Sequence, residues 1–193
     1  LKQPVRAVIR NPSKLSSPDI PHKIADYFNL QQLTEALMGG DTVFVLTPEN
    51  PASQHILQDT KTIVENYKQA IQRSGIRRVI ALSCVGAHID GNTGNIQMSR
   101  MLEQALEELP IEKVFIRPTY YFSNWLGYWE TIQQHGVLPT FFPEELKMDM
   151  HSPIDLAKFI AQVITNSIPS KKVYELVGPQ QYSSKDVAAA FSK

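Results

Sequence analysis

Two cations near the N-terminus form the most suggestive chemical pattern in the sequence. Arg10 follows the β-rich segment Val5–Ile9, and Lys14 lies four residues further on, after Asn11. A guanidinium binds a phosphate through two parallel hydrogen bonds in one plane, and an ammonium adds a point charge. The 2′-phosphate of an adenosine ribose fits such a pair, whereas an unphosphorylated ribose favours an acidic residue there. A solvated turn with two surface cations explains the same residues equally well.

Polar and aromatic residues also follow the next strand-like segments. Asp26 and Tyr27 come after a short apolar stretch, and Thr47 and Pro48 come after the run 42–46. A carboxylate can accept from an adenine amino group, an aromatic ring can flank the base, and Thr47-Pro48 can press backbone against adenosine. In isolation, a helix-entry acid and a core aromatic are the commoner roles for Asp26 and Tyr27.

A second group of candidates follows the apolar run 79–82. The hydroxyl of Ser83 could bond either a carboxamide or a substrate carbonyl. We expect Cys84 to be an inert thiol, because no neighbouring cation is evident to lower its pKa. His88 and His151 are possible proton donors, although a lone histidine is more often structural or exposed.

Segment 120–129 is rich in aromatic residues. Its aromatic residues are Tyr120, Tyr121, Phe122, Trp125, Tyr128 and Trp129. They could wall an apolar pocket for a flat substrate, with Asn124 as the polar residue that orients it. A plain hydrophobic core accounts for them equally well.

The elements that must position these residues alternate between strands and helices. We expect strands at 5–9, 23–25, 42–46, 79–82, 114–116 and 173–177, of which 42–46 and 79–82 have the apolar character of strands buried on both faces. Asn29, Ser53 and Ser152 are the expected N-caps of helices, and Gly75 is an expected helix end. The pattern predicts an α/β fold: a doubly wound parallel sheet with helices on both faces, right-handed crossovers, and ligands beyond the carboxyl ends of the strands.

Composition limits the remaining function classes. The chain has 193 residues, which favours a single domain over 1–193, and 19 basic residues balance 19 acidic ones. This balance gives no support for direct nucleic-acid or membrane-surface binding, and no apolar run is long enough to span a membrane. A single cysteine excludes an internal disulfide and favours a cytoplasmic setting. Five scattered histidines offer no metal site.

Several expected signals are missing. The sequence has no Gly-x-Gly-x-x-Gly run, no P-loop and no obvious strand upstream of Val5. It starts at Leu1, without Met, and its last residue, Lys193, falls in a helix-like segment. We therefore expect the domain to be incomplete at both ends.

The order of the segments resembles the NmrA-like family of atypical short-chain dehydrogenase/reductases. The resemblance covers nearly the whole chain, and its order and spacing are more specific than any single piece. The matching pieces are 5–12 (VRAVIRNP), 40–48 (GDTVFVLTP), 78–83 (RVIALS) and 115–124 (FIRPTYYFSN).

This resemblance implies a Rossmann-type fold with NADP (NADPH) in an extended cleft and a substrate pocket built around 119–152. By the family pattern, the adenosine end of the cofactor would be held by Arg10, Asn11, Lys14, Asp26, Tyr27, Thr47 and Pro48. The nicotinamide would be approached by Ser83, Pro118 and Tyr121, and the substrate by His88, Asn124 and Trp125.

Two departures from the family pattern shape the functional hypotheses. The glycine turn that takes the pyrophosphate is missing, and so is the Tyr-x-x-x-Lys pair, because the helix from Asn95 holds neither Tyr nor Lys before Leu109. The first hypothesis is an NADP-dependent reductase of a quinone-like or other flat apolar acceptor, to which water or a histidine supplies the proton. The second is a non-catalytic NADP(H) sensor that acts through a regulatory protein partner. A homodimer is compatible with either, and the missing pair argues against a sugar-nucleotide epimerase.

Overall fold

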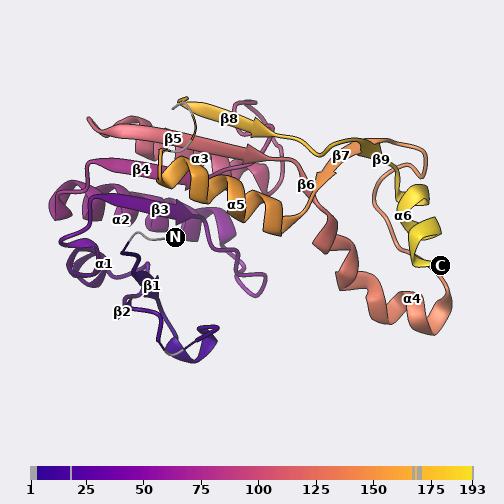
Figure 1. Cartoon of the computed structure of the whole chain (residues 1–193), viewed down its shortest axis with the longest axis horizontal. Coiled ribbons are helices and arrows are strands. Elements are labelled where there is room, and N and C mark those ends of the chain that lie inside the picture. Colours follow the sequence, from indigo (N-terminus) through magenta and orange to yellow (C-terminus); the bar gives the residue numbers. More distant parts are fainter. Residues whose placement is uncertain (1–3, 18, 167, 169–170, 193) are drawn as a thin grey trace.

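A four-stranded parallel sheet forms the centre of the molecule. The computed structural model describes residues 4–17, 19–166, 168 and 171–192. The strands lie in the order β3-β4-β5-β8, and every neighbouring pair is parallel (Figure 1). Their bounds are β3 Thr42–Leu46, β4 Arg78–Leu82, β5 Glu112–Pro118 and β8 Val173–Leu176. The predicted parallel α/β architecture is confirmed.

Helices cover both faces of this sheet, as the sequence predicts (Figure 1). Successive side chains of a strand point to opposite faces, so Val79 and Ala81 join one core cluster while Ile80 joins another. The first cluster packs against α2 (Ile56–Ser74) and α3 (Ile96–Glu107), and the second packs against α5 (Pro153–Ile164). Val79, Ile80 and Ala81 of β4 are fully buried and Leu82 is half-buried, so the prediction for 79–82 is confirmed except at its last residue.

The prediction that 42–46 is buried on both faces is wrong. Of this segment only Val45 is buried, and Leu46 is 43% exposed. The reason is topological, since β3 is the first strand of the four-stranded order and has β4 as its only neighbour in that sheet. An apolar run therefore occurs here in an edge strand, where one flank lacks a covering strand.

The first two strands form a separate parallel pair. β1 (Ala7–Ile9) lies beside β2 (His22–Ile24), with a short 3₁₀ turn, η1 (Pro12–Lys14), in the connection. Helix α1 (Leu30–Leu37) follows and packs on α2, and Arg6 donates to the carbonyl oxygens of residues 36 and 38 at its end. The pair is thus tied to the core through α1.

Helix boundaries test the capping predictions directly. Asn29 accepts a hydrogen bond from the backbone of α1, and Ser152 does the same for α5, so both predicted N-caps are confirmed. Gly75 ends α2 in the left-handed conformation, also as predicted. The prediction for Ser53 is wrong, because α2 begins two residues later than expected, with His55 at its N-cap. Ser53 instead accepts from the His55 backbone and donates to Asp59.

A smaller sheet extends from the carboxyl side of the main sheet (Figure 1). In it β7 pairs in parallel with β6 and antiparallel with β9. The strands and helices of this part are β6 Tyr120–Tyr121, η2 Phe122–Tyr128, α4 Trp129–His135, β7 Met148–His151, β9 Gln181–Tyr182 and α6 Ser184–Phe191. Lys193, expected in the last helix, lies outside the described residues.

The connection between the two sheets depends on a close backbone approach. After β8, Gly178 lies so near the carbonyl group of Met150 in β7 that a Cβ atom at position 178 would collide with it. Glycine is therefore required at this position for steric reasons. The chain just after β8 therefore packs closely against β7.

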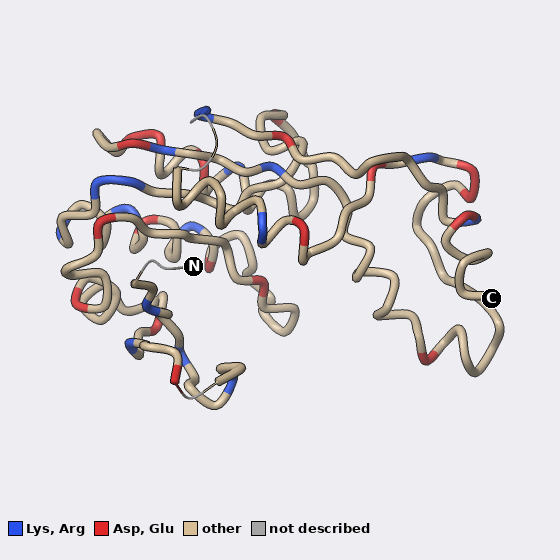
Figure 2. Tube along the Cα trace, viewed as in Figure 1, with Lys and Arg blue, Asp and Glu red and all other residues tan. Residues whose placement is uncertain are grey.

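The charged residues are spread over the whole molecule. Basic and acidic positions are interspersed along the trace, in keeping with the zero formal net charge (Figure 2). Among the described residues, no helix combines the length and the apolar character required for crossing a bilayer.

Candidate functional site

A hollow lies at the carboxyl ends of the first three strands. Arg10 after β1, Tyr27 and Phe28 after β2, and Pro48 after β3 all line it. The floor is completed by the start of α2, where Asp59 accepts a hydrogen bond from Ser53 at 2.6 Å. The volume of this hollow is about 50 Å³. Its position matches the sequence expectation for an α/β sheet.

Arg10 and Tyr27 form the polar part of this hollow. The guanidinium lies 5.1 Å from the centre of the Tyr27 ring, and Nη1 donates to the phenol oxygen at 3.0 Å. Asn66 of α2 holds the same residue by donating to the Tyr27 carbonyl at 3.0 Å. The result is a cation and an aromatic face kept together at the strand ends.

The other residues predicted for the adenosine end do not line this hollow. Asn11 caps η1 by accepting from Ser13, and Lys14 is exposed within that turn. Asp26 accepts from the backbone of Phe28 in the turn that leads into α1, which agrees with the helix-entry role that the sequence also allowed. Thr47 is half-buried beside Pro48.

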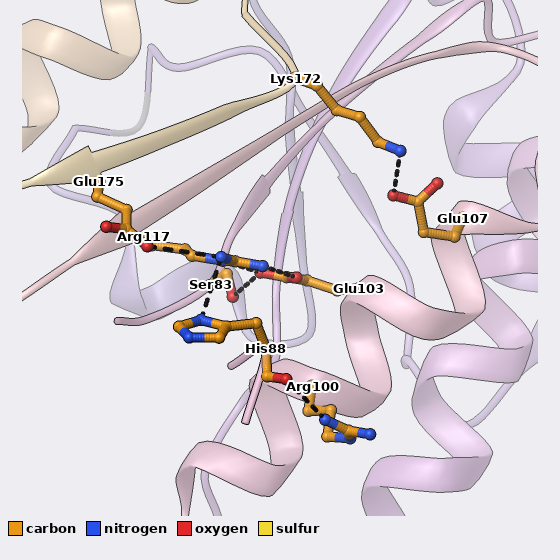
Figure 3. Close-up of polar contacts among 8 residues, drawn as sticks. All are labelled: Ser83, His88, Arg100, Glu103, Glu107, Arg117, Lys172 and Glu175. Atoms are coloured by element: carbon orange, nitrogen blue, oxygen red, sulfur yellow. Dashed lines mark hydrogen bonds and ion pairs between the residues drawn. The ribbon is translucent and has the colours of Figure 1, made fainter. Parts of the chain in front are cut away.

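A cluster of buried charges lies beyond β4 and β5 (Figure 3). Arg117 of β5 donates to both carboxylate oxygens of Glu103 on α3, from Nε at 2.9 Å and from Nη2 at 2.7 Å. The side chains are only 12% and 11% exposed. Ser83 donates from Oγ to Glu103 Oε1 at 2.5 Å, so one carboxylate joins α3 to both strands.

The strand register brings these three residues together. Ser83 follows Val79 and Ala81 at a spacing of two, and Arg117 follows Phe115, so both face α2 and α3. The Ser83 backbone continues the ladder by donating to the Ile116 carbonyl at 2.8 Å. On the core-facing side of both β4 and β5, the apolar residues are therefore followed by a polar residue at the same height in the sheet.

Arg117 also reaches the loop after β4. Its Nη1 lies 3.6 Å from Glu175 and 3.4 Å from Nδ1 of His88 (Figure 3). A guanidinium has no acceptor atom, so Nδ1 must present its lone pair and the ring hydrogen is assigned to Nε2. A second arginine, Arg100 of α3, donates to the His88 carbonyl at 3.1 Å. The loop is thus anchored at its ring and at its backbone.

Cys84 lies beside this cluster and is half-buried. Burial raises the pKa of its thiol, with a smaller contribution in the same direction from the charge of Glu103, and together these outweigh the lowering by the hydrogen bond with Ser99 and by the charge of Arg117. The thiol is therefore protonated near neutral pH, which agrees with the predicted inert role.

The residues after β5 form a third group. Pro118 is buried and accepts from the Val85 backbone, while Tyr121 lies against His151 with ring centres 4.9 Å apart. Thr119 Oγ1 is 3.2 Å from Nδ1 of His151. His151 is 7% exposed, and its Nε2 has no hydrogen-bond partner among the described residues. Burial raises the pKa of Tyr121 and lowers that of His151.

The aromatic segment serves partly as core and partly as a cavity wall. Trp125 is 2% exposed and donates from its indole nitrogen to the sulfur of Met150 at 3.4 Å. It also borders an apolar cavity of about 360 Å³ between η2 and α6, together with Phe122 and Phe191. Asn124 is exposed and bonds Tyr120. The segment therefore contributes both to the core and to a cavity wall, while a substrate in that cavity stays a prediction.

Glu103 and Arg117 were not predicted as site residues. A signal for them exists in the sequence: Arg117 interrupts the apolar strand between Ile116 and Pro118, and Glu103 adjoins Leu102 in the apolar stripe of its helix. A charge at a core-facing position needs an opposite partner. Only the packing of α3 against β5 shows that these two charges meet.

With this geometry established, comparison with known proteins becomes informative. Residues 1–167 match the family model described as NAD(P)H-binding. The chain belongs to this NAD(P)H-binding family. The predicted resemblance to dinucleotide-binding reductases is thereby confirmed at the level of the family.

Two curated relatives align with almost the whole length of this chain. It is 27% identical over 198 residues to the NAD(P)H azoreductase of Xenophilus azovorans, covering 99% of the chain and 65% of that protein. It is 25% identical over 194 residues to quinone oxidoreductase 2 of Escherichia coli strain K12, covering 97% and 64%. The chain thus spans less than two thirds of the length of these curated relatives.

Solved structures show the same fold. The NADPH-dependent quinone oxidoreductase of Escherichia coli, crystallised with NADPH, superposes with a TM-score of 0.82 at 24% identity, covering 99% of this chain and 67% of that one. The triphenylmethane reductase of Citrobacter sp., complexed with NADP(H), has a TM-score of 0.81 at 18% identity, covering 97% and 65%. Both similarities support the Rossmann-type architecture.

The buried ion pair leads to a stability prediction. Arg117→Met leaves the Glu103 carboxylate buried without its partner, which costs about 3–5 kcal/mol of unfolding free energy. Lys172→Met is the matched control, because Lys172 also ties α3 to the sheet, through Glu107 at 2.7 Å, but that pair is exposed and worth at most about 1 kcal/mol. Urea unfolding followed by circular dichroism measures both.

The double variant Glu103→Leu/Arg117→Met extends this test. It removes both charges together, so it should recover much of the loss seen in Arg117→Met. Equal and small losses for Arg117→Met and Lys172→Met would contradict a desolvated ion pair.

His151 makes stability depend on pH. Burial lowers its pKa in the folded state below the ordinary value of 6.5, so the unfolded chain takes up the proton first as the pH falls. Its contribution is fully present above that ordinary value and is lost as the pH falls below it. Urea midpoints between pH 5 and 8 should fall less steeply for His151→Phe than for the native protein. Parallel curves would rule out this titration.

Proposed function

We propose that this chain forms the NADP(H)-binding core of an NADP-dependent oxidoreductase, which reduces a quinone-like or other flat apolar acceptor by hydride transfer. The observation that carries the proposal is the placement of Arg10 against Tyr27 in a hollow at the carboxyl ends of parallel strands. Membership of the NAD(P)H-binding family supports a dinucleotide as the ligand.

The adenosine end of the cofactor fits the residues present. Arg10 has donors left after its bond to Tyr27 and can bind a 2′-phosphate bidentately. Tyr27 and Phe28 offer aromatic faces to the base, and Pro48 closes the opposite side. Asn11, Lys14, Asp26 and Thr47 remain proposed contacts around this hollow. They lie outside its lining, in the segments that directly follow β1, β2 and β3 in the chain.

The nicotinamide end would lie across β4 and β5, beside Ser83, Pro118 and Tyr121. When bound, the reduced cofactor supplies a hydride to the acceptor. Ser83 and Pro118 are fixed by backbone hydrogen bonds between the strand ends and the β4 loop, so they present a rigid surface. The pyrophosphate contacts are not assigned, because the sequence contains no Gly-x-Gly-x-x-Gly turn.

The proposed acceptor contacts are His88, Asn124 and Trp125. Trp125 lines the cavity of about 360 Å³ between η2 and α6, whose aromatic walls suit a flat apolar molecule. Asn124 belongs to the same segment, whereas His88 lies beside Arg117 in the loop after β4. The names of the relatives, an azoreductase and a quinone oxidoreductase, agree with acceptors of this kind.

The polar groups near Ser83 limit the chemistry. The Ser83 hydrogen is directed to Glu103, and the His88 ring turns its lone pair to Arg117, so neither is arranged as a strong acid. A quinone suits such a site, because water can protonate the hydroquinone oxygen after hydride transfer. The same arrangement also suits the alternative function, a non-catalytic sensor that binds NADP(H) and a regulatory partner.

Turnover separates these two functions. The full-length gene product is mixed with NADPH and a panel of quinones, and cofactor oxidation is followed by absorbance. The reductase proposal expects saturable oxidation that depends on the quinone. Tight NADPH binding with no oxidation of any panel member, and cofactor-dependent capture of a partner protein, would select the sensor instead.

Arg10 provides the test of cofactor choice. Arg10→Ala should weaken NADP binding about ten- to a hundredfold and NAD binding much less, because a charge-assisted bidentate contact to the 2′-phosphate is lost. Arg73→Ala, an exposed cation elsewhere on α2, is the control for the change in net charge. Isothermal titration calorimetry gives the dissociation constants. Equal losses for the two nucleotides would show that Arg10 does not contact that phosphate.

A further inference from the structure

The hydroxyl of Ser83 has its hydrogen-bonding direction fixed by its neighbours. The group has one hydrogen, and it donates that hydrogen to Glu103 Oε1 at 2.5 Å (Figure 3). Glu103 accepts one hydrogen bond from Arg117 on each of its oxygens, and as the carboxylate of this ion pair it has no hydrogen of its own to give. The serine must therefore be the donor in this contact.

Rotation of the hydroxyl away from Glu103 is opposed by the rest of the cluster. Ser83 is 5% exposed, and its backbone is tied to Ile116. Arg117 is itself held by Glu103 and Glu175, so the carboxylate cannot follow a moving serine without giving up charge-assisted hydrogen bonds. Ser83 Oγ can therefore offer a ligand only its lone pairs, which accept hydrogen bonds.

We propose that Glu103 and Arg117 are positioning residues that make Ser83 Oγ a hydrogen-bond acceptor for the amide N–H of the bound nicotinamide carboxamide. This inference rests on the proposed function. A carboxamide NH₂ carries two donors and matches the free lone pairs, whereas a substrate carbonyl carries none and would face them without a hydrogen. Of the two roles that the sequence allowed for Ser83, the geometry selects the contact with the cofactor.

The test compares two cofactors that differ in one functional group. In the 3-acetylpyridine analogue of NADP⁺ a methyl ketone replaces the carboxamide, so the amide N–H donors are missing. Dissociation constants of NADP⁺ and of this analogue are measured by calorimetry on the full-length gene product, with no turnover needed. Ser83→Ala should weaken NADP⁺ roughly three- to tenfold, the usual range for one hydrogen bond, and leave the analogue unchanged.

The positioning role of Glu103 is tested by the same ratio of dissociation constants. Glu103→Leu/Arg117→Met removes the carboxylate without leaving a buried unpaired charge, and it frees the serine hydrogen to donate to the analogue's ketone oxygen. The preference for NADP⁺ over the analogue should therefore shrink. Glu103→Gln retains an oxygen that can accept from Ser83 and should keep the preference. Glu107→Ala, on the same helix beside exposed Lys172, is the control and should also keep it.

Other outcomes overturn the inference. Equal weakening of both cofactors by Ser83→Ala, or a rise in acceptor KM with unchanged cofactor binding, would assign Ser83 to a structural or substrate role. A double variant that weakens both cofactors equally would reduce Glu103 and Arg117 to structural residues. If the native protein binds neither dinucleotide, the proposed function itself fails, and this result is distinct from the others.

Discussion

The ion pair between Arg117 and Glu103 is the interaction on which the arrangement of the site depends. Two opposite charges are removed from water between a strand and a helix, and neither is tolerable there without the other. The pair fixes the distance between α3 and β5 and gives Ser83 its partner on β4. Through His88 the same guanidinium reaches the loop that follows β4. One desolvated contact thereby orders the carboxyl ends of two neighbouring strands.

The sequence predicted the elements that depend on local patterns. Apolar runs of four or five residues marked the strands, and side chains that satisfy free backbone amides marked the helix starts at Asn29 and Ser152. The alternation of these elements was sufficient to predict the parallel sheet and the edge at which Arg10, Tyr27 and Ser83 lie. These features depend on short-range chemistry, which the linear sequence contains directly.

Features set by long-range pairing were not accessible in the same way. The exposure of β3 depends on its place at one edge of the strand order, which an apolar run cannot reveal. Ser53 lies in a turn before α2 because Asp59 and His55 offered it competing partners. Glu103 and Arg117 are separated by a helix end and a turn, so their contact follows only from the facing of α3 on β5. Strand order decides the first case, competition between nearby hydrogen-bond partners the second, and helix packing the third.

The close approach of Gly178 to Met150 has a consequence for how such proteins diversify. At this point the small sheet meets the chain after β8 through main-chain atoms, so this contact does not depend on the side chains that the sheet displays. Exchange of an aromatic residue such as Phe122 leaves the contact between Gly178 and Met150 in place, whereas any side chain at position 178 would collide with Met150. Substitutions can therefore change the surface of the small sheet while the main-chain contact at Gly178 is retained.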